Sequence, residues 1–164
     1  MSSLIADKKP RATWVVLHNA GAHFELRASS WFMAFMTLGV GVMMTVHPDM
    51  LTGSISSAAY FRRMTILLDQ SIWRTLFLFV GTSLIVALTI NGSFPAFRWT
   101  PHIRFAMSCL SVAIWSQVAI SVMGGFPTIG TVAYPVLVLV EAHNAFQALK
   151  DIRGRGDRNG RDRA

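Results

Sequence analysis

The acidic residue Glu141 is the first candidate for chemistry, because it stands inside an apolar helical run, residues 131–150. A carboxyl group in such a setting could hold a proton, bind a cation or pair with a basic side chain. His143 is the nearest metal-ligating side chain in that run. Two residues apart on a helix, Glu141 and His143 point about 200° away from each other and cannot share a metal ion. We therefore expect no metal site and look to a basic partner for Glu141.

Arg104 is the basic residue best placed to be that partner. If the hydrocarbon layer ends near Gln147, Glu141 lies about 9 Å deep by helix rise, within reach of a long arginine side chain. The sequence predicts an Arg104–Glu141 contact inside the bundle, shared with His102. Such a pair either clips two helices together or carries protons. Gln117 is a further polar candidate, which either bonds helices to each other or binds a permeating ligand.

Recognisable patterns of catalysis and cofactor binding are missing from the chain. The sequence has no Gly-rich phosphate loop, no His-Glu-x-x-His helix and no nucleophile elbow. Its single cysteine, Cys109, excludes an intramolecular disulfide and disfavours a cysteine metal cluster. We expect no enzymatic activity and no cofactor.

Composition places these candidates in a membrane. The 164 residues are 52% hydrophobic and only 14% charged, and the apolar residues come in long blocks. The net charge of +7 could indicate nucleic-acid binding, yet the basic residues cluster at the two ends and in short loops, where membrane topology signals lie. We therefore expect the bilayer, and no nucleic acid, as the partner.

The apolar blocks predict an all-α protein, an integral membrane four-helix antiparallel bundle. The expected spans are 28–46, 72–90, 105–123 and 131–149 within a bundle of residues 28–150. Residues 1–27 are expected to form a tail and an interfacial segment, and 51–70 a helix at the interface or an extension of the second span. The basic segment 151–164 is predicted to be disordered and to lie against anionic headgroups.

Small residues spaced four apart mark the faces on which these spans should pack. Such spacing lets two helices approach closely in lipid. On the third span we expect the small and polar stripe to face the bundle and the bulky side chains to lie largely elsewhere. The predicted packing residues are Thr37, Gly41, Ser83, Ala87, Cys109 and Ala113.

Basic residues near the spans predict the orientation. Four precede the first span, six follow the last, and the loop 124–130 has none. Because cytoplasmic loops carry the excess of Lys and Arg, both termini are expected in the cytoplasm. Arg62 and Arg63 run against this assignment, since it puts them on the outer side.

Short motifs in roughly the last ninety residues resemble a known group of proteins. These motifs are FLFVG at 77–81, ALTING at 87–92, TPHIR at 100–104, TVAYP at 131–135 and LVEAHNAFQALKD at 139–151. Through them the chain looks like small four-span membrane proteins encoded by bacteriophages and prophages of alphaproteobacteria. The resemblance implies a setting, without a mechanism.

Two functions from different classes follow as expectations. The first is a phage-type protein of the bacterial inner membrane, holin-like or a superinfection-exclusion factor, which works through helix packing and homo-oligomerisation. The second is an accessory subunit or a small-solute or ion transporter with a polar path at Gln117 and Glu141.

Overall fold

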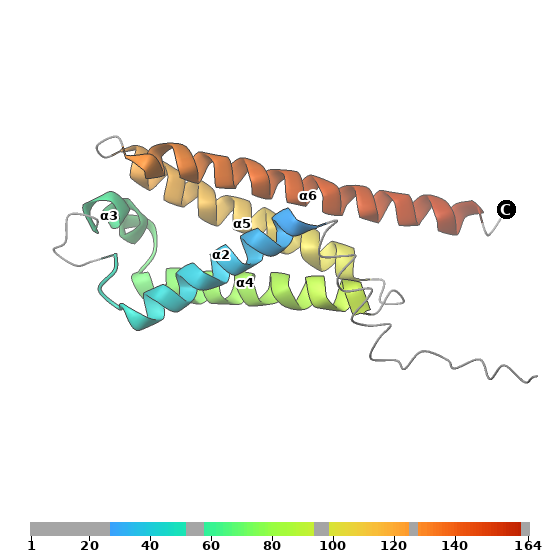
Figure 1. Ribbon diagram of the computed structural model, residues 1–164, viewed down its shortest axis with the longest axis horizontal. Coiled ribbons are helices and arrows are strands. Elements are labelled where there is room, and N and C mark those ends of the chain that lie inside the picture. The colour runs from blue at the N-terminus through green and yellow to red at the C-terminus, as the bar shows by residue number, and fades with distance from the viewer. Residues whose placement is uncertain (1–26, 52–57, 94–98, 125–127, 162–164) are drawn as a thin grey trace, which may run out of the picture.

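The computed structural model describes residues 27–51, 58–93, 99–124 and 128–161. The predicted interfacial segment before Arg27 lies outside these residues. Within them the chain forms five helices and no strand (Figure 1). The helices are α2 (Ala28–Val46), α3 (Ala58–Leu67), α4 (Gln70–Ser93), α5 (Thr100–Met123) and α6 (Ile129–Arg161).

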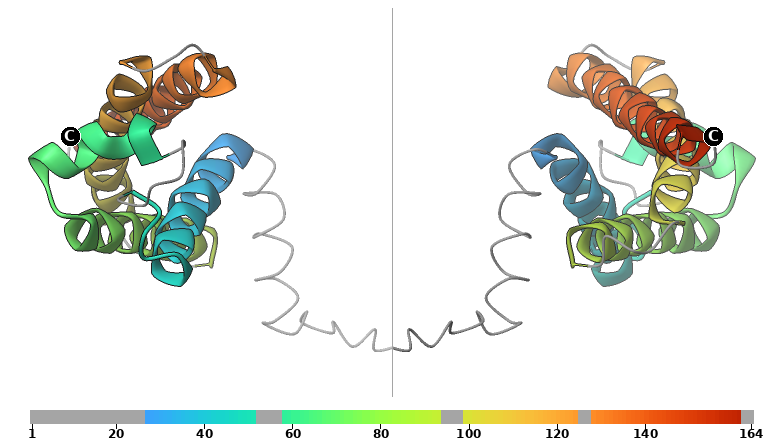
Figure 2. Two further views of the ribbon diagram at one scale, coloured as in Figure 1. Left: turned by 90° about the vertical axis from the view of Figure 1, so that its left-hand side faces the viewer. Right: turned by 90° about the vertical axis from the view of Figure 1, so that its right-hand side faces the viewer.

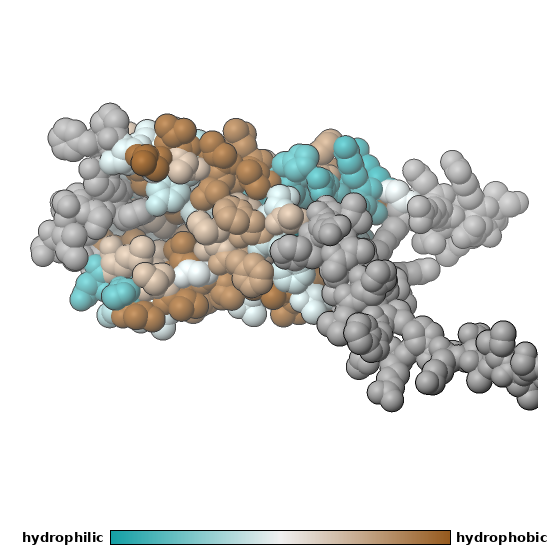
Figure 3. Space-filling view, in the orientation of Figure 1, coloured by the Kyte–Doolittle hydropathy of each residue, from teal (hydrophilic) through white to brown (hydrophobic). Residues whose placement is uncertain are grey.

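Four of these helices, α2, α4, α5 and α6, are long and apolar enough to cross a membrane. The first predicted span coincides with α2, and the other three lie within α4, α5 and α6. Large apolar side chains such as Phe79, Val132 and Leu139 are exposed on the outside of the bundle. Figure 3 shows this apolar surface over most of the bundle, with hydrophilic residues toward the far part of α6. The all-α fold is confirmed, and four apolar helices of membrane-spanning length indicate a multi-pass membrane protein.

Successive long helices run in opposite directions (Figure 1). The most extensive contacts join α2 to α4 and α5 to α6, and α4 packs against α5 to hold the two pairs together. We name the end where α2 and α5 begin the Asp151 end, after the α6 residue found there. The opposite end, where α3 lies, is the α3 end.

Two glycines allow α2 and α4 to cross at close range. A Cβ atom added to Gly41 on α2 would lie 2.8 Å from the backbone nitrogen of Leu78. One added to Gly81 on α4 would lie 2.5 Å from the backbone nitrogen of Leu38. Thr37 and Gly41 are buried, as is Ala87, while Ser83 is half-buried. The predicted packing role of Thr37 and Gly41 is therefore seen in the structure.

Trp115 joins all four long helices at the centre of the bundle. Its indole Nε1 donates a hydrogen bond of 3.1 Å to Thr37 Oγ1 on α2. Its ring meets the edge of Phe77 on α4 at 5.8 Å and stacks on Tyr134 of α6 at 6.1 Å. Trp115 is 1% exposed, so its contacts with Thr37, Phe77 and Tyr134 fix the positions of the four helices relative to one another from the buried interior.

The short helix α3 lies across one end of the bundle (Figure 2, left). The Trp73 indole of α4 donates a 2.8 Å hydrogen bond to the carbonyl oxygen of Met64, whose side chain is fully buried. Asp69 separates α3 from α4, and its Oδ1 accepts a 2.8 Å hydrogen bond from the Ser71 backbone. Hydrogen bonds from Ser71 lower the pKa of Asp69. Of the two forms expected for this connection, the separate helix is observed.

The prediction of a disordered tail is wrong for most of its length, because α6 continues to Arg161. At 1.5 Å per residue its 33 residues measure about 50 Å, against about 28 Å for the 19 residues of α2. The C-terminal part of α6 accordingly projects beyond the Asp151 end (Figure 1). Residues 162–164 lie outside the described part of the chain.

The close crossing predicts a difference between two glycines of the same helix. Gly41→Ala should destabilise the bundle by about 1–3 kcal/mol, because the new methyl group overlaps the α4 backbone. Gly39→Ala is the matched control: a Cβ there meets nothing within 4 Å, so only the gain in helix propensity remains. Unfolding of the purified variants in mild detergent measures both. Equal effects of the two substitutions would contradict the close contact.

Candidate functional site

Glu141 is buried inside the bundle, with 1% of its surface exposed. Its Oε2 accepts a 2.9 Å hydrogen bond from Asn144 Nδ2, one turn later on α6. Asn144 Oδ1 in turn accepts a 2.8 Å hydrogen bond from the Ser29 hydroxyl at the start of α2. The carboxyl group is therefore held in place by a chain of hydrogen bonds that begins at the half-buried Ser29.

The Glu141 carboxyl lies close to serine side chains of α5. Its second oxygen, Oε1, is buried and has no hydrogen-bond partner among the described residues. Ser108 and Ser111 of α5, also buried, lie close enough to interact with the carboxyl. Within the described part of the chain the Ser111 hydroxyl has no hydrogen-bond partner either. We call Glu141, Asn144, Ser29, Ser108 and Ser111 the Glu141 cluster; three helices contribute to it.

The expected Arg104–Glu141 contact is not formed, which corrects the prediction. Arg104 Nη1 lies 3.1 Å from Asp151 Oδ2, and Arg27 Nη2 lies 2.8 Å from the same oxygen. Arg104 is 3% exposed, so its charge needs a partner, and Asp151 provides it. The reason for the error is that α6 continues as a helix through Asp151, which brings a carboxylate to the level of Arg104.

Asp151 and its two arginines tie together three parts of the chain. Arg27 directly precedes α2, Arg104 lies in the first turns of α5, and Asp151 belongs to α6. Two guanidinium groups share one carboxylate, which leaves the group of three with one positive charge. Asp151 is ten residues beyond Glu141, about 15 Å along the helix axis. The charged group and the Glu141 cluster are thus separate.

The other predicted polar residues lie away from Glu141. His102 is exposed, and its ring lies 5.8 Å from the ring of Trp99. It takes no part in the contact between Arg104 and Asp151. His143 is also exposed and contacts Gln147 at 2.7 Å, which agrees with its expected position opposite Glu141. Gln117 is half-buried, and its side chain makes no hydrogen bond to another described residue.

The face of α5 that packs was predicted correctly for Ser121, which is buried, but wrongly for most of the stripe. Cys109 and Ala113, expected inside, are exposed, whereas the bulky Ile114, Val118 and Val122 are buried. Lipid accepts small and large apolar groups alike, so size alone does not decide which of them faces the neighbouring helices. The buried face of α5 is instead shown by Arg104, Ser108, Ser111 and Trp115.

Sequence reasoning missed most of the Glu141 cluster, although a signal existed. Asn144 stands three residues after Glu141, and Ser108 and Ser111 are also three apart, so each pair shares one helix face. Arg104 falls on the same face as Ser108. Aligning the two polar faces in an antiparallel pair would have placed Arg104 beside Asp151 and the serines beside Glu141.

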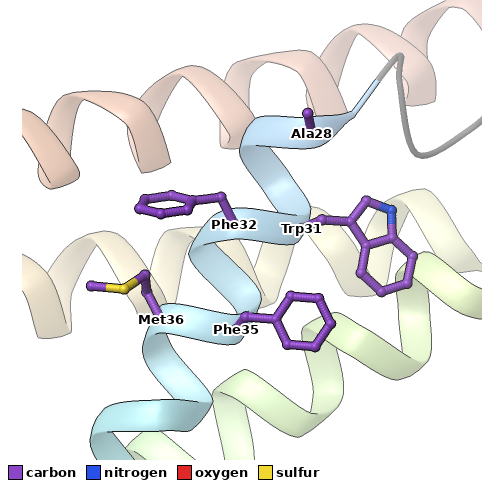
Figure 4. Close-up of a pocket in the computed structure, with 5 residues that line it drawn as sticks. All are labelled: Ala28, Trp31, Phe32, Phe35 and Met36. Atoms are coloured by element: carbon purple, nitrogen blue, oxygen red, sulfur yellow. The ribbon is translucent and has the colours of Figure 1, made fainter.

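A hollow lies on the outside of α2, and its lining is mostly apolar. It is lined by Ala28, Trp31, Phe32, Phe35 and Met36. Figure 4 shows the rings of Trp31 and Phe35 on one side of the helix and Phe32 and Met36 on the other. The Trp31 and Phe35 rings stack at 5.8 Å. Such a surface suits contact with lipid acyl chains.

The chemistry available to the Glu141 cluster is that of one carboxyl group among neutral hydroxyl and amide groups. The described residues contain no group of three His, Cys, Asp or Glu side chains that could hold a metal ion. A carboxyl group so placed can bind a proton or a small cation. Compared with known proteins, the chain matches no family model, no curated protein and no solved structure.

The ion pairs predict a pattern of energetic coupling. Arg104→Ala combined with Asp151→Ala should cost less than the sum of the two single changes, with a coupling of about 0.5–3 kcal/mol, because the groups contact each other. Arg104→Ala combined with Glu141→Ala should be additive within about 0.5 kcal/mol. Unfolding of the single and double variants in detergent measures both cycles. Energetic coupling of Arg104 to Glu141, without coupling to Asp151, would instead support the Arg104–Glu141 contact predicted from the sequence.

Proposed function

We propose that the protein is a small multi-pass protein of the bacterial inner membrane that acts by helix packing and self-assembly, in the manner of phage holins or superinfection-exclusion proteins. Its motifs resemble those of small phage-encoded four-span proteins. The action requires no catalytic group and no cofactor. The partner is a further copy of the chain within the bilayer.

The observation that carries this proposal is the outward face of α5, formed by Ala106, Cys109, Ala113, Ser116 and Gln117. The first three residues are exposed and the last two half-buried. An amide group that faces acyl chains without a hydrogen bond is costly, so Gln117 favours a protein neighbour over lipid. Small residues beside it allow a second helix to come close. The outward face of α5 therefore suits a second copy of this chain.

Charge supports an orientation with the Asp151 end in the cytoplasm. That end carries Arg27, Arg104, Lys150 and Arg153, and the projecting part of α6 continues with Arg155, Arg158 and Arg161. Cytoplasmic ends hold the excess of basic residues, and anionic headgroups attract such a segment. Arg63 at the α3 end runs against the rule, but its guanidinium lies against Gly124 at the C-terminus of α5, where a cation is favourable.

An accessory subunit or transporter is the second candidate, and the buried Glu141 favours it. The two residues of the expected polar path face different ways, however. Glu141 points into the bundle, whereas Gln117 is half-buried on the outward face of α5. Any path would therefore involve Glu141 within one copy and Gln117 between copies.

Self-assembly predicts that two copies can be joined through Cys109. The side chain is exposed on the outward face of α5 and is the chain's only cysteine. Oxidation or a short bis-maleimide linker, applied to membranes that contain the full chain, should give a covalent dimer on a denaturing gel. The matched control is Cys109→Ser with Val86→Cys, which moves the thiol to an exposed position on α4. Equal cross-linking from both positions would indicate random collision and contradict the proposal.

The biological action predicts an effect on the host membrane. Induced expression in bacteria should either dissipate the membrane potential or block entry of phage DNA, measured with a potential-sensitive dye and by infection. Gln117→Leu removes the amide from the outward face and should weaken the effect and the cross-link together. If expression changes neither the potential nor infection, the proposal fails.

A further inference from the structure

We propose that the Glu141 carboxyl is a binding site for one monovalent cation, and that this cation is a proton. The site consists of the Glu141 carboxyl on α6, whose Oε1 is buried without a partner among the described residues, with Ser108 and Ser111 of α5 close to the carboxyl group. Asn144 holds the other carboxyl oxygen. All residues of this site belong to one copy of the chain, so proton binding does not require self-assembly.

Hydrogen bonding at the Glu141 carboxyl is incomplete. A carboxylate accepts several hydrogen bonds, and here the only one observed among the described residues comes from Asn144, at 2.9 Å. Oε1 is buried without a partner in the part of the chain that the structure describes. A buried carboxylate with one hydrogen bond is poorly compensated for its lost hydration, and a bound proton removes the charge that needs compensation.

Charge favours the same state. Among the described residues, Arg104 on α5 and Arg27 before α2 both bind Asp151 on α6 itself, and none of the three forms an ion pair with Glu141. Tyr134, about two turns earlier on α6, stacks on Trp115. The one charged residue of α4, Arg74, lies in its first turns at the α3 end. An ionised Glu141 would have no counter-charge, whereas a protonated one needs none.

Coordination requirements distinguish a proton from a metal cation. An alkali or alkaline-earth ion needs several oxygen ligands around it. Backbone carbonyl groups of α5 and α6 take part in helical hydrogen bonds, so the carboxyl group and the hydroxyls of Ser108 and Ser111 are the oxygen ligands that the cluster offers. A proton needs a single acceptor. The donor set of the Glu141 cluster thus fits a proton best.

Binding and release of the proton would change the contact between α5 and α6. In the neutral state the carboxyl group lies close to the serines of α5 without a net charge. Loss of the proton leaves a charge in this contact, which favours water entry beside Ser29, where the cluster reaches the half-buried edge of the bundle. The site thus makes the α5–α6 contact sensitive to pH.

Dicyclohexylcarbodiimide tests the proposal, because this apolar reagent adds to protonated carboxyl groups in apolar surroundings and leaves carboxylates unmodified. The full chain is treated in lipid vesicles at a series of pH values, and peptide mapping by mass spectrometry locates the adduct. We expect the adduct at Glu141 at a pH at which exposed carboxyl groups such as that of Asp69 are ionised and give none, and its loss as the pH is raised further. Mapping of the wild-type chain makes the result independent of whether a variant folds.

Two variants serve as controls. Glu141→Gln keeps the shape of the neutral carboxyl group and should lose the adduct, while Asp69→Asn, which removes an exposed carboxyl, should leave it unchanged. Absence of an adduct at Glu141 over the whole pH range would overturn the proposal. Protection by sodium chloride but not by choline chloride at constant pH would show that a metal cation, and not a proton, occupies the site. Neither result depends on cross-linking through Cys109, so the two proposals fail separately.

Discussion

The shared ion pair of Asp151 with Arg27 and Arg104 sets the level at which three helices meet. Arg104 is almost fully buried, and a buried guanidinium without a carboxylate is costly, so α5 and α6 can slide past each other only by breaking this contact. Arg27 ties the start of α2 to the same carboxylate. With that level fixed, the serines of α5 fall beside Glu141, and Trp115 falls beside Tyr134.

The two ends of the bundle are held by different forces. Buried polar side chains gather toward the Asp151 end, whereas Leu51, Met64 and Phe77 form an apolar interior toward the α3 end. Lipid is as apolar as this interior, so burial of apolar side chains gives little driving force there. Close packing must supply the stability, which is why α2 and α4 need glycines at their crossing. Polar contacts thus stabilise the bundle toward the Asp151 end, and close packing stabilises it toward the α3 end.

The sequence predicted the elements of the fold better than their faces. Long uncharged runs limit where a span can lie, and α2 has the bounds expected of it. The predicted burial of Cys109 and Ala113 on α5 was wrong because these residues differ from Ile114 mainly in size. Lipid accommodates small and large side chains alike. The predicted partner of Arg104 was wrong because the Gly-rich segment after Lys150 has the composition of a disordered tail. In the structure this segment continues α6. Three-residue spacing of polar side chains was the signal that would have found the Glu141 cluster.

Helix α5 connects the two features to which we assign a role. Its inner face carries Ser108 and Ser111 against Glu141, and its outer face carries Cys109, Ala113 and Gln117. Side chains on opposite faces of one helix move together when the helix tilts or shifts. A change of charge at Glu141 that moves α5 relative to α6 would therefore also move the surface offered to a second copy. Under the two proposals, α5 is therefore the element that would connect a change at the buried Glu141 with the surface offered to a second copy.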